Sequence, residues 1–210
     1  MLAFLDRHVR AWHMLLAVAA GSAWFAGMTV ATQAALPGVK LFRCPIGLCP
    51  GYYLPSELNA TLTRIGKSGR DFLAETLLPL DMVLPALLLV AFVAVYIWFS
   101  RPGEAFAVPL SPGSRRALLC VPFSYCAADY AENFALVEAL RTYPNIPYWL
   151  ARRASFLTAT KSQLITASVG IAVALAIAAW GRGRAEGPSF PPNEALSGNA
   201  EPNSRRKDRG

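Results

Sequence analysis

The sequence predicts an all-α protein, a bundle of four transmembrane helices, and three observations lead to this prediction. Of its 210 residues, 54% are hydrophobic and only 16% are charged, whereas an ordinary soluble domain carries roughly 25% charged residues. The apolar residues are gathered into a few long runs, each near the ~20 residues that cross a bilayer core. The basic residues stand mostly between these runs and in the C-terminal tail, as is typical of membrane proteins.

The first predicted helix covers residues 11–31 and follows Arg7 and Arg10. Its apolar run exceeds the core of a signal peptide, which has roughly 7–15 residues, and no A-x-A cleavage site follows it. The pattern therefore favours an uncleaved membrane helix over a cleaved signal sequence.

The loop that follows, residues 32–76, is too polar to lie within the membrane. Inside it, residues 56–65 have an amphipathic pattern, with Ser56 as the expected N-cap and Gly66 as the stop. The apolar face of this short helix is formed by Leu58, Leu62 and Ile65. We expect it to lie along the membrane surface.

Two cysteines, Cys44 and Cys49, stand close together in the same loop among prolines and glycines that permit a tight bend. Outside the cytoplasm they can form a disulfide. Two free thiols, or half of a metal site, are the alternatives. Cys120 and Cys126 fall within the third predicted helix and are expected to fill space as small apolar residues.

The second predicted helix, residues 77–100, is the most hydrophobic run and ends at the turn sequence of residues 101–103. The fourth, residues 155–180, ends before a tail, residues 182–210, that is rich in Gly, Pro, Asn, Ser and charge. Such a composition predicts disorder. The membrane domain is therefore expected to cover residues 1–181.

The third predicted helix, residues 117–140, is the weakest of the four because it contains acidic side chains. Basic residues bracket it at a distance that suits a membrane span. Asp129, Glu132 and Asn133 fall at positions i, i+3 and i+4, so they share one helical face. A helix with a single polar stripe can cross a membrane when that stripe faces other helices.

Four spans place both termini on one side of the membrane. That side carries a small excess of Lys and Arg over the opposite side, so the positive-inside rule predicts cytoplasmic termini. We expect the bacterial inner membrane as the location.

The net charge of +7 fits retained loops or attraction to anionic lipid headgroups. No nucleic acid is expected as a partner, because no basic soluble domain is predicted.

Ionisable residues of three predicted helices fall in one layer of the membrane. Asp81 lies about one turn, and Lys161 about two turns, from the non-cytoplasmic ends of their helices. Glu132 and Asn133 lie about two turns from the same end, and Asp129 lies one turn deeper. Charged groups at this depth are costly and usually face inward, so Lys161 should have a carboxylate partner. These five residues are the candidate catalytic or binding residues.

The predicted layer has two interpretations, an interhelical lock that fixes helix register or a functional pocket. A pocket could belong to an enzyme acting on a lipid or isoprenoid headgroup, with Glu132 or Asp129 as the acid or base. It could also belong to an oligomeric proton-coupled transporter. The lock would suit a non-catalytic assembly protein, and whether the protein is an enzyme stays open.

Several chemistries are disfavoured, and neither a cofactor nor a metal is expected. The only histidines, His8 and His13, stand at the opposite end of the first helix, which argues against a histidine-ligated zinc hydrolase. The sequence has no Walker loop, no G-x-S-x-G elbow, no G-x-G-x-x-G fingerprint and no C-x-x-C pair. Lys161 would oppose a metal held by the carboxylates alone.

Three short motifs resemble a group of small, uncharacterised bacterial four-helix integral membrane proteins. They are Gly66-Lys67-Ser68-Gly69-Arg70 leading into Leu80-Asp81, Asp129-Tyr130-Ala131-Glu132-Asn133, and Thr158 with Lys161. The resemblance covers roughly residues 5–180 and implies the four-helix topology and the candidate site residues, but no activity. The pair Cys44 and Cys49 is not part of the pattern.

The sequence therefore predicts an integral membrane protein that binds a lipid or small amphiphile in its bundle or serves as an assembly partner. Its expected partners are membrane lipids and further copies of itself in a homo-oligomer.

Overall fold

A computed structural model describes residues 2–36, 53–102 and 107–185 of the chain, and every regular element in these residues is a helix. In chain order they are α1 (Leu2–His8), α2 (Ala11–Ala35), α3 (Pro55–Arg64), α4 (Gly66–Phe72), the π-helix η1 (Leu73–Leu77), α5 (Leu78–Asp81), α6 (Leu84–Phe99), α7 (Pro112–Thr142) and α8 (Tyr148–Ala185). The predicted all-α class is confirmed for this part of the chain. The pair Cys44 and Cys49, and the tail from residue 186, lie outside the described residues.

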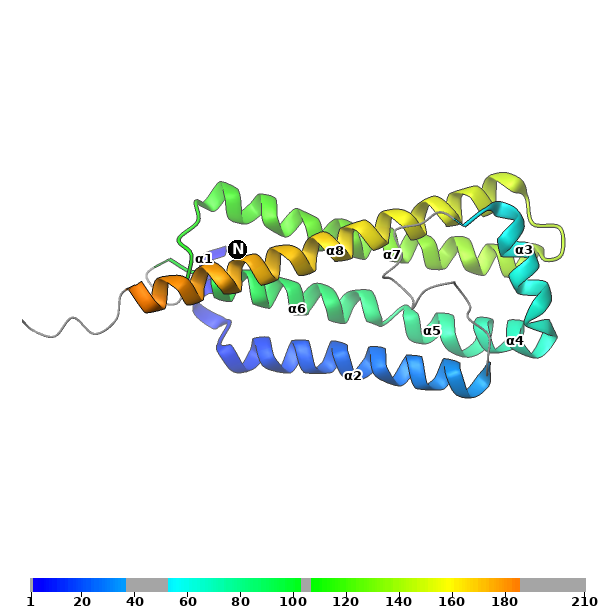
Figure 1. Cartoon of the computed structure of the whole chain (residues 1–210), viewed down its shortest axis with the longest axis horizontal. Coiled ribbons are helices and arrows are strands. Elements are labelled where there is room, and N and C mark those ends of the chain that lie inside the picture. Colours follow the sequence, from blue (N-terminus) through cyan, green and yellow to red (C-terminus); the bar gives the residue numbers. More distant parts are fainter. Residues whose placement is uncertain (1, 37–52, 103–106, 186–210) are drawn as a thin grey trace, which may run out of the picture.

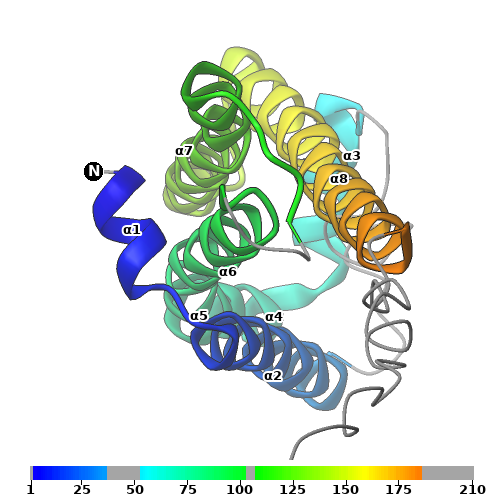
Figure 2. The same ribbon diagram turned by 90° about the vertical axis from the view of Figure 1, so that its left-hand side faces the viewer.

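The long helical segments run side by side along the long axis of the molecule (Figure 1). They are α2, the series from α4 to α6, α7 and α8. Viewed end-on, α6 lies between α2 and the pair α7 and α8 (Figure 2), and it packs against all three. α1 and the C-terminal end of α8 lie at one end of the bundle, and α3 crosses the other end (Figure 1).

Three of the described helices are long and apolar enough to cross a membrane. They are Ala11–Ala35, the interrupted series Gly66–Phe99, and Tyr148–Arg184. Their outer faces expose large apolar side chains, such as Leu15 on α2 and Ile177 on α8. An apolar surface around a partly polar interior fits a lipid environment, so the described helices are compatible with a membrane protein.

The second predicted helix begins earlier and is less regular than the sequence suggested. It extends from Gly66 to Phe99, with a π-helical turn at η1 and a break after Asp81. Pro85 has no N–H to donate to the carbonyl of Asp81, so the normal helical ladder is interrupted there. The indole of Trp24 on α2 donates to the carbonyl of Leu80 at 2.9 Å and fastens α2 to the break.

The fourth predicted helix is longer at both ends than residues 155–180. α8 begins at Tyr148 and continues to Ala185, so residues 182–185 are helical although they were assigned to the tail. Cys126 is buried as predicted, but Cys120 is exposed on α7, so only one of these two thiols fills interior space.

The short helix of the first loop packs on the end of the bundle. α3 begins at Pro55, where the side chain of Glu57 accepts a hydrogen bond from the N–H of Leu54. Ser56 is therefore inside the helix and is not its N-cap. The apolar face of α3 joins the buried cluster that contains Leu150 and Ala154 of α8. Its stop is as predicted, because Gly66 adopts a φ of 70°, which glycine permits at little cost.

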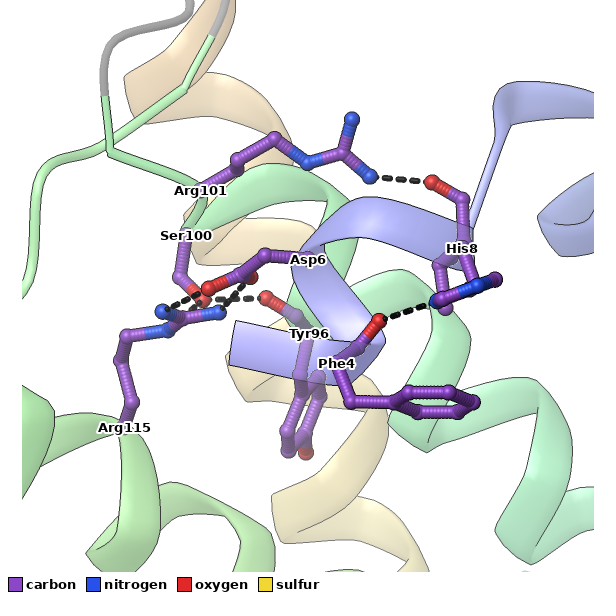
Figure 3. A network of polar contacts seen from close by, with 8 residues as sticks. Phe4, Asp6, His8, Tyr96, Ser100, Arg101 and Arg115 are labelled. Carbon is purple, nitrogen blue, oxygen red and sulfur yellow. Dashed lines mark hydrogen bonds and ion pairs between the residues drawn. The ribbon is translucent and has the colours of Figure 1, made fainter. Parts of the chain in front are cut away.

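A polar network fastens α1 to the opposite end of the bundle (Figure 3). Arg115 at the start of α7 is 5% exposed, and its Nη1 atom donates to Asp6 of α1 at 2.9 Å. Its Nε atom donates to the hydroxyl of Ser100 at 3.1 Å, which in turn donates to the carbonyl of Tyr96. The network joins α1, α6 and α7 at the end where both α1 and the last turn of α8 lie.

Candidate functional site

The structure places all five predicted site residues together in the interior of the bundle, and we call them the lysine–carboxylate cluster. Asp81 comes from the end of α5, and Lys161 comes from α8. Asp129, Glu132 and Asn133 come from one face of α7. None of the five is more than 8% exposed, although the interior of a membrane protein is costly for charge.

Lys161 forms the centre of the lysine–carboxylate cluster. Its Nζ atom donates to Oδ1 of Asp129 at 2.8 Å and makes a second ion pair with Oε2 of Glu132. One ammonium group from α8 thus bridges two carboxylates that stand one helical turn apart on α7. The bridge gives Lys161 the carboxylate partners that its depth requires and joins the two helices.

Two hydroxyl groups occupy the remaining oxygens of these carboxylates. The Tyr125 hydroxyl donates to Oδ2 of Asp129 at 2.7 Å, and the Thr158 hydroxyl donates to Oε1 of Glu132. Each oxygen of Asp129 and Glu132 therefore has a protein partner. Tyr125 was within reach of sequence reasoning, because it precedes Asp129 by four residues and so shares its helical face.

The third carboxylate belongs to Asp81, beside the break that Pro85 causes. It lies close to the side-chain amide of Asn133 and within electrostatic range of Lys161. Neither amide atom of Asn133 has a hydrogen bond of standard geometry to the described residues, although the side chain is fully buried. Three carboxyl groups thus lie around one ammonium group in the cluster.

Tyr53 is a neighbour of the lysine–carboxylate cluster that sequence reasoning missed. It precedes α3, its carbonyl accepts a hydrogen bond from Ser155 of α8 at 2.7 Å, and its side chain lies near Thr158 and Glu132. Burial raises the pKa of the Tyr53 hydroxyl, so the hydroxyl is neutral at physiological pH. No local pattern in the loop could have revealed this contact.

The N-terminal end of α8 carries a second feature, a groove of about 610 Å³ open to the surroundings. It is lined by Tyr148, Trp149, Arg152, Arg153 and Phe156. The aromatic residues fit the interface region of a membrane, where Tyr and Trp are enriched. All five residues belong to the first turns of α8, and the sequence showed the arginines only as charges on one side of the membrane. We call it the α8 groove.

In the part of the chain that the structure describes, no group of three or more His, Cys, Asp and Glu side chains is arranged to hold a metal ion. No protein-family model, curated protein or solved structure matches the chain. Within residues 2–36, 53–102 and 107–185 the regular structure is all helical, and three helices are suited to crossing a membrane.

Proposed function

We propose that the chain is a four-span integral membrane protein that binds a lipid or small amphiphile at the α8 groove. The lysine–carboxylate cluster serves as the internal lock of the bundle and not as a catalytic centre. One contrast supports this choice. Three oxygens of Asp129 and Glu132 accept hydrogen bonds from protein groups and the fourth, Oε2 of Glu132, is ion-paired with Lys161, whereas the α8 groove is open and has exposed arginine and aromatic side chains.

α7 is the fourth span in this proposal. Its 31 residues extend roughly 46 Å at 1.5 Å per residue, more than the ~30 Å of a hydrocarbon core. Its acidic residues face the bundle, while Phe123 and Phe134 are 51% and 65% exposed on its outer side. The helix therefore turns its polar stripe toward protein and its aromatic residues toward lipid.

The lysine–carboxylate cluster is closed to substrates, and this favours a structural role, as an interhelical lock, over the role of an enzyme site or a transporter site. A general acid or base must come within about 2.6–3.2 Å of the proton that it transfers. Asp129 and Glu132 are 1% and 3% exposed, and their bonds to Lys161, Tyr125 and Thr158 would have to break before a substrate could reach them. A lock needs no such opening.

Purification in mild detergent tests lipid binding. We expect bound phospholipid to survive size-exclusion chromatography and to appear as an adduct in native mass spectrometry. The double substitution Trp149→Ala and Phe156→Ala should remove most of the adduct, because it deletes two apolar walls of the α8 groove. Phe134→Ala, an exposed position on α7, is the control and should retain it. Absence of any adduct from the unchanged protein would refute the proposed function.

Labelling of the folded protein in the membrane tests the topology. We propose a bacterial inner-membrane protein with cytoplasmic termini, following the distribution of basic residues. A fluorescent reporter fused after Gly210 should then be active in the cytoplasm. In a cysteine-free background, Ser56→Cys, exposed on α3, should react with a membrane-impermeant maleimide added from outside the cytoplasm. The opposite pattern would reverse the orientation and place the loop with Cys44 and Cys49 in a reducing compartment.

A further inference from the structure

Building on the proposed amphiphile binding, we propose that the α8 groove selects an anionic phospholipid. Arg152 and Arg153 hold the phosphate of its headgroup, and Phe156 contacts the upper part of an acyl chain. α8 begins at the end of the bundle that α3 crosses (Figure 1), and the residues that line the groove belong to the first turns of α8.

The α8 groove has the wall composition of a headgroup site. Arg152 and Arg153 are both exposed, and they are adjacent on the helix, so their side chains leave it about 100° apart and can approach one ligand from two sides. Tyr148 and Trp149 are 69% and 62% exposed. A guanidinium group offers paired donors that match the oxygens of a phosphate, and the aromatic rings suit headgroup depth.

The charge of the α8 groove is not compensated by the described protein residues. The side chains of Arg152 and Arg153 form no ion pair or hydrogen bond with residues 2–36, 53–102 and 107–185. The first turn of α8 has no acidic residue, and the N-terminus of a helix itself carries a partial positive charge. Two arginines near that terminus reinforce this charge, so an anion is the complementary occupant.

The apolar surface beside the arginines distinguishes a phospholipid from a soluble anion. Phe156 is 53% exposed one turn further along α8, and Val169, Val173 and Ile177 are exposed closer to its C-terminal end. A free phosphate would leave these side chains without a role in the site. An acyl chain that descends from the headgroup would contact the exposed face of α8.

Native mass spectrometry of the detergent-purified full chain can test the headgroup preference. Delipidated protein is titrated with phosphatidylglycerol or with zwitterionic phosphatidylcholine. Each arginine near a membrane surface contributes about fivefold in affinity for anionic lipid. We therefore expect a preference of roughly 30-fold for phosphatidylglycerol, and the double substitution Arg152→Gln and Arg153→Gln should abolish it.

The matched control removes two positive charges from the other end of the bundle. Arg116→Gln with Arg184→Gln has the same change in net charge, both side chains being exposed, and should keep the preference. Equal binding of both lipids by the unchanged protein would overturn the anionic selectivity while leaving amphiphile binding intact, whereas binding of neither would refute the proposed function itself. Displacement of phosphatidylglycerol by millimolar inorganic phosphate would also overturn the selectivity for a phospholipid.

Discussion

Replacing Lys161 with methionine should destabilise the folded bundle by about 3–5 kcal/mol, the cost of breaking a buried ion pair by removing one partner. Methionine keeps much of the volume but cannot bond to Asp129 or Glu132, which are almost fully buried. Unfolding in mixed micelles with increasing denaturant, followed by tryptophan fluorescence, measures the free energy of unfolding.

A control and a double substitution separate pairing from general damage. Gln163 is exposed on the same helix, so Gln163→Met should change the unfolding free energy by no more than about 0.5 kcal/mol. Combining Lys161→Met with Glu132→Gln should cost less than the sum of the two single changes, because each removes the same interaction. Additive costs would show that Lys161 and Glu132 are not energetically coupled, and the lock would then lose its support.

Replacing Gly69 with alanine should destabilise the protein by about 1–2 kcal/mol, within the range for overpacking a filled interior. A Cβ atom at this position would stand 2.7 Å from Cβ of Ile65 and 3.1 Å from Cδ2 of Leu36. The first of these distances is shorter than real Cβ contacts allow, so α4 would have to move relative to α3 and α2. The same unfolding measurement reports the loss.

Gly170 provides the matched control, since it lies within α8 and has no atom within 4 Å of an added Cβ. Gly170→Ala should be neutral or stabilise the protein by up to about 1 kcal/mol, because alanine favours a helix over glycine. If both substitutions had the same effect, the close approach around Gly69 would be disproved. The close approach of Ile65 and Leu36 also gives a physical reason for the glycine at position 69.

Hydropathy and helical periodicity were sufficient to predict the four long helical segments and the polar stripe on α7. Both signals are local, because about 20 apolar residues mark a span and residues three or four apart share a helical face. Asp129, Glu132 and Asn133 therefore could be placed together from the sequence. Depth along the helices further predicted that Lys161 lies in the same layer, where an isolated charge is costly.

Only the tertiary structure decided which groups meet within that layer and which stay apart. Lys161 bridges Asp129 and Glu132, while Asp81 lies beside Asn133, and the sequence could not distinguish these partners. Arg115 is buried, but its neighbour Arg116 is exposed, because only one of them faces Asp6.

The contact of Tyr53 with the lysine–carboxylate cluster and the packing of α3 on α8 could not be predicted from the sequence for the same reason. Each depends on how distant segments are rotated and inclined toward one another. Helical periodicity tells which residues share a face, but the partner of that face is set by packing between helices. The sequence by itself therefore determined the helices and the depth of their polar residues, and the packing of the bundle determined the pairs that those residues form.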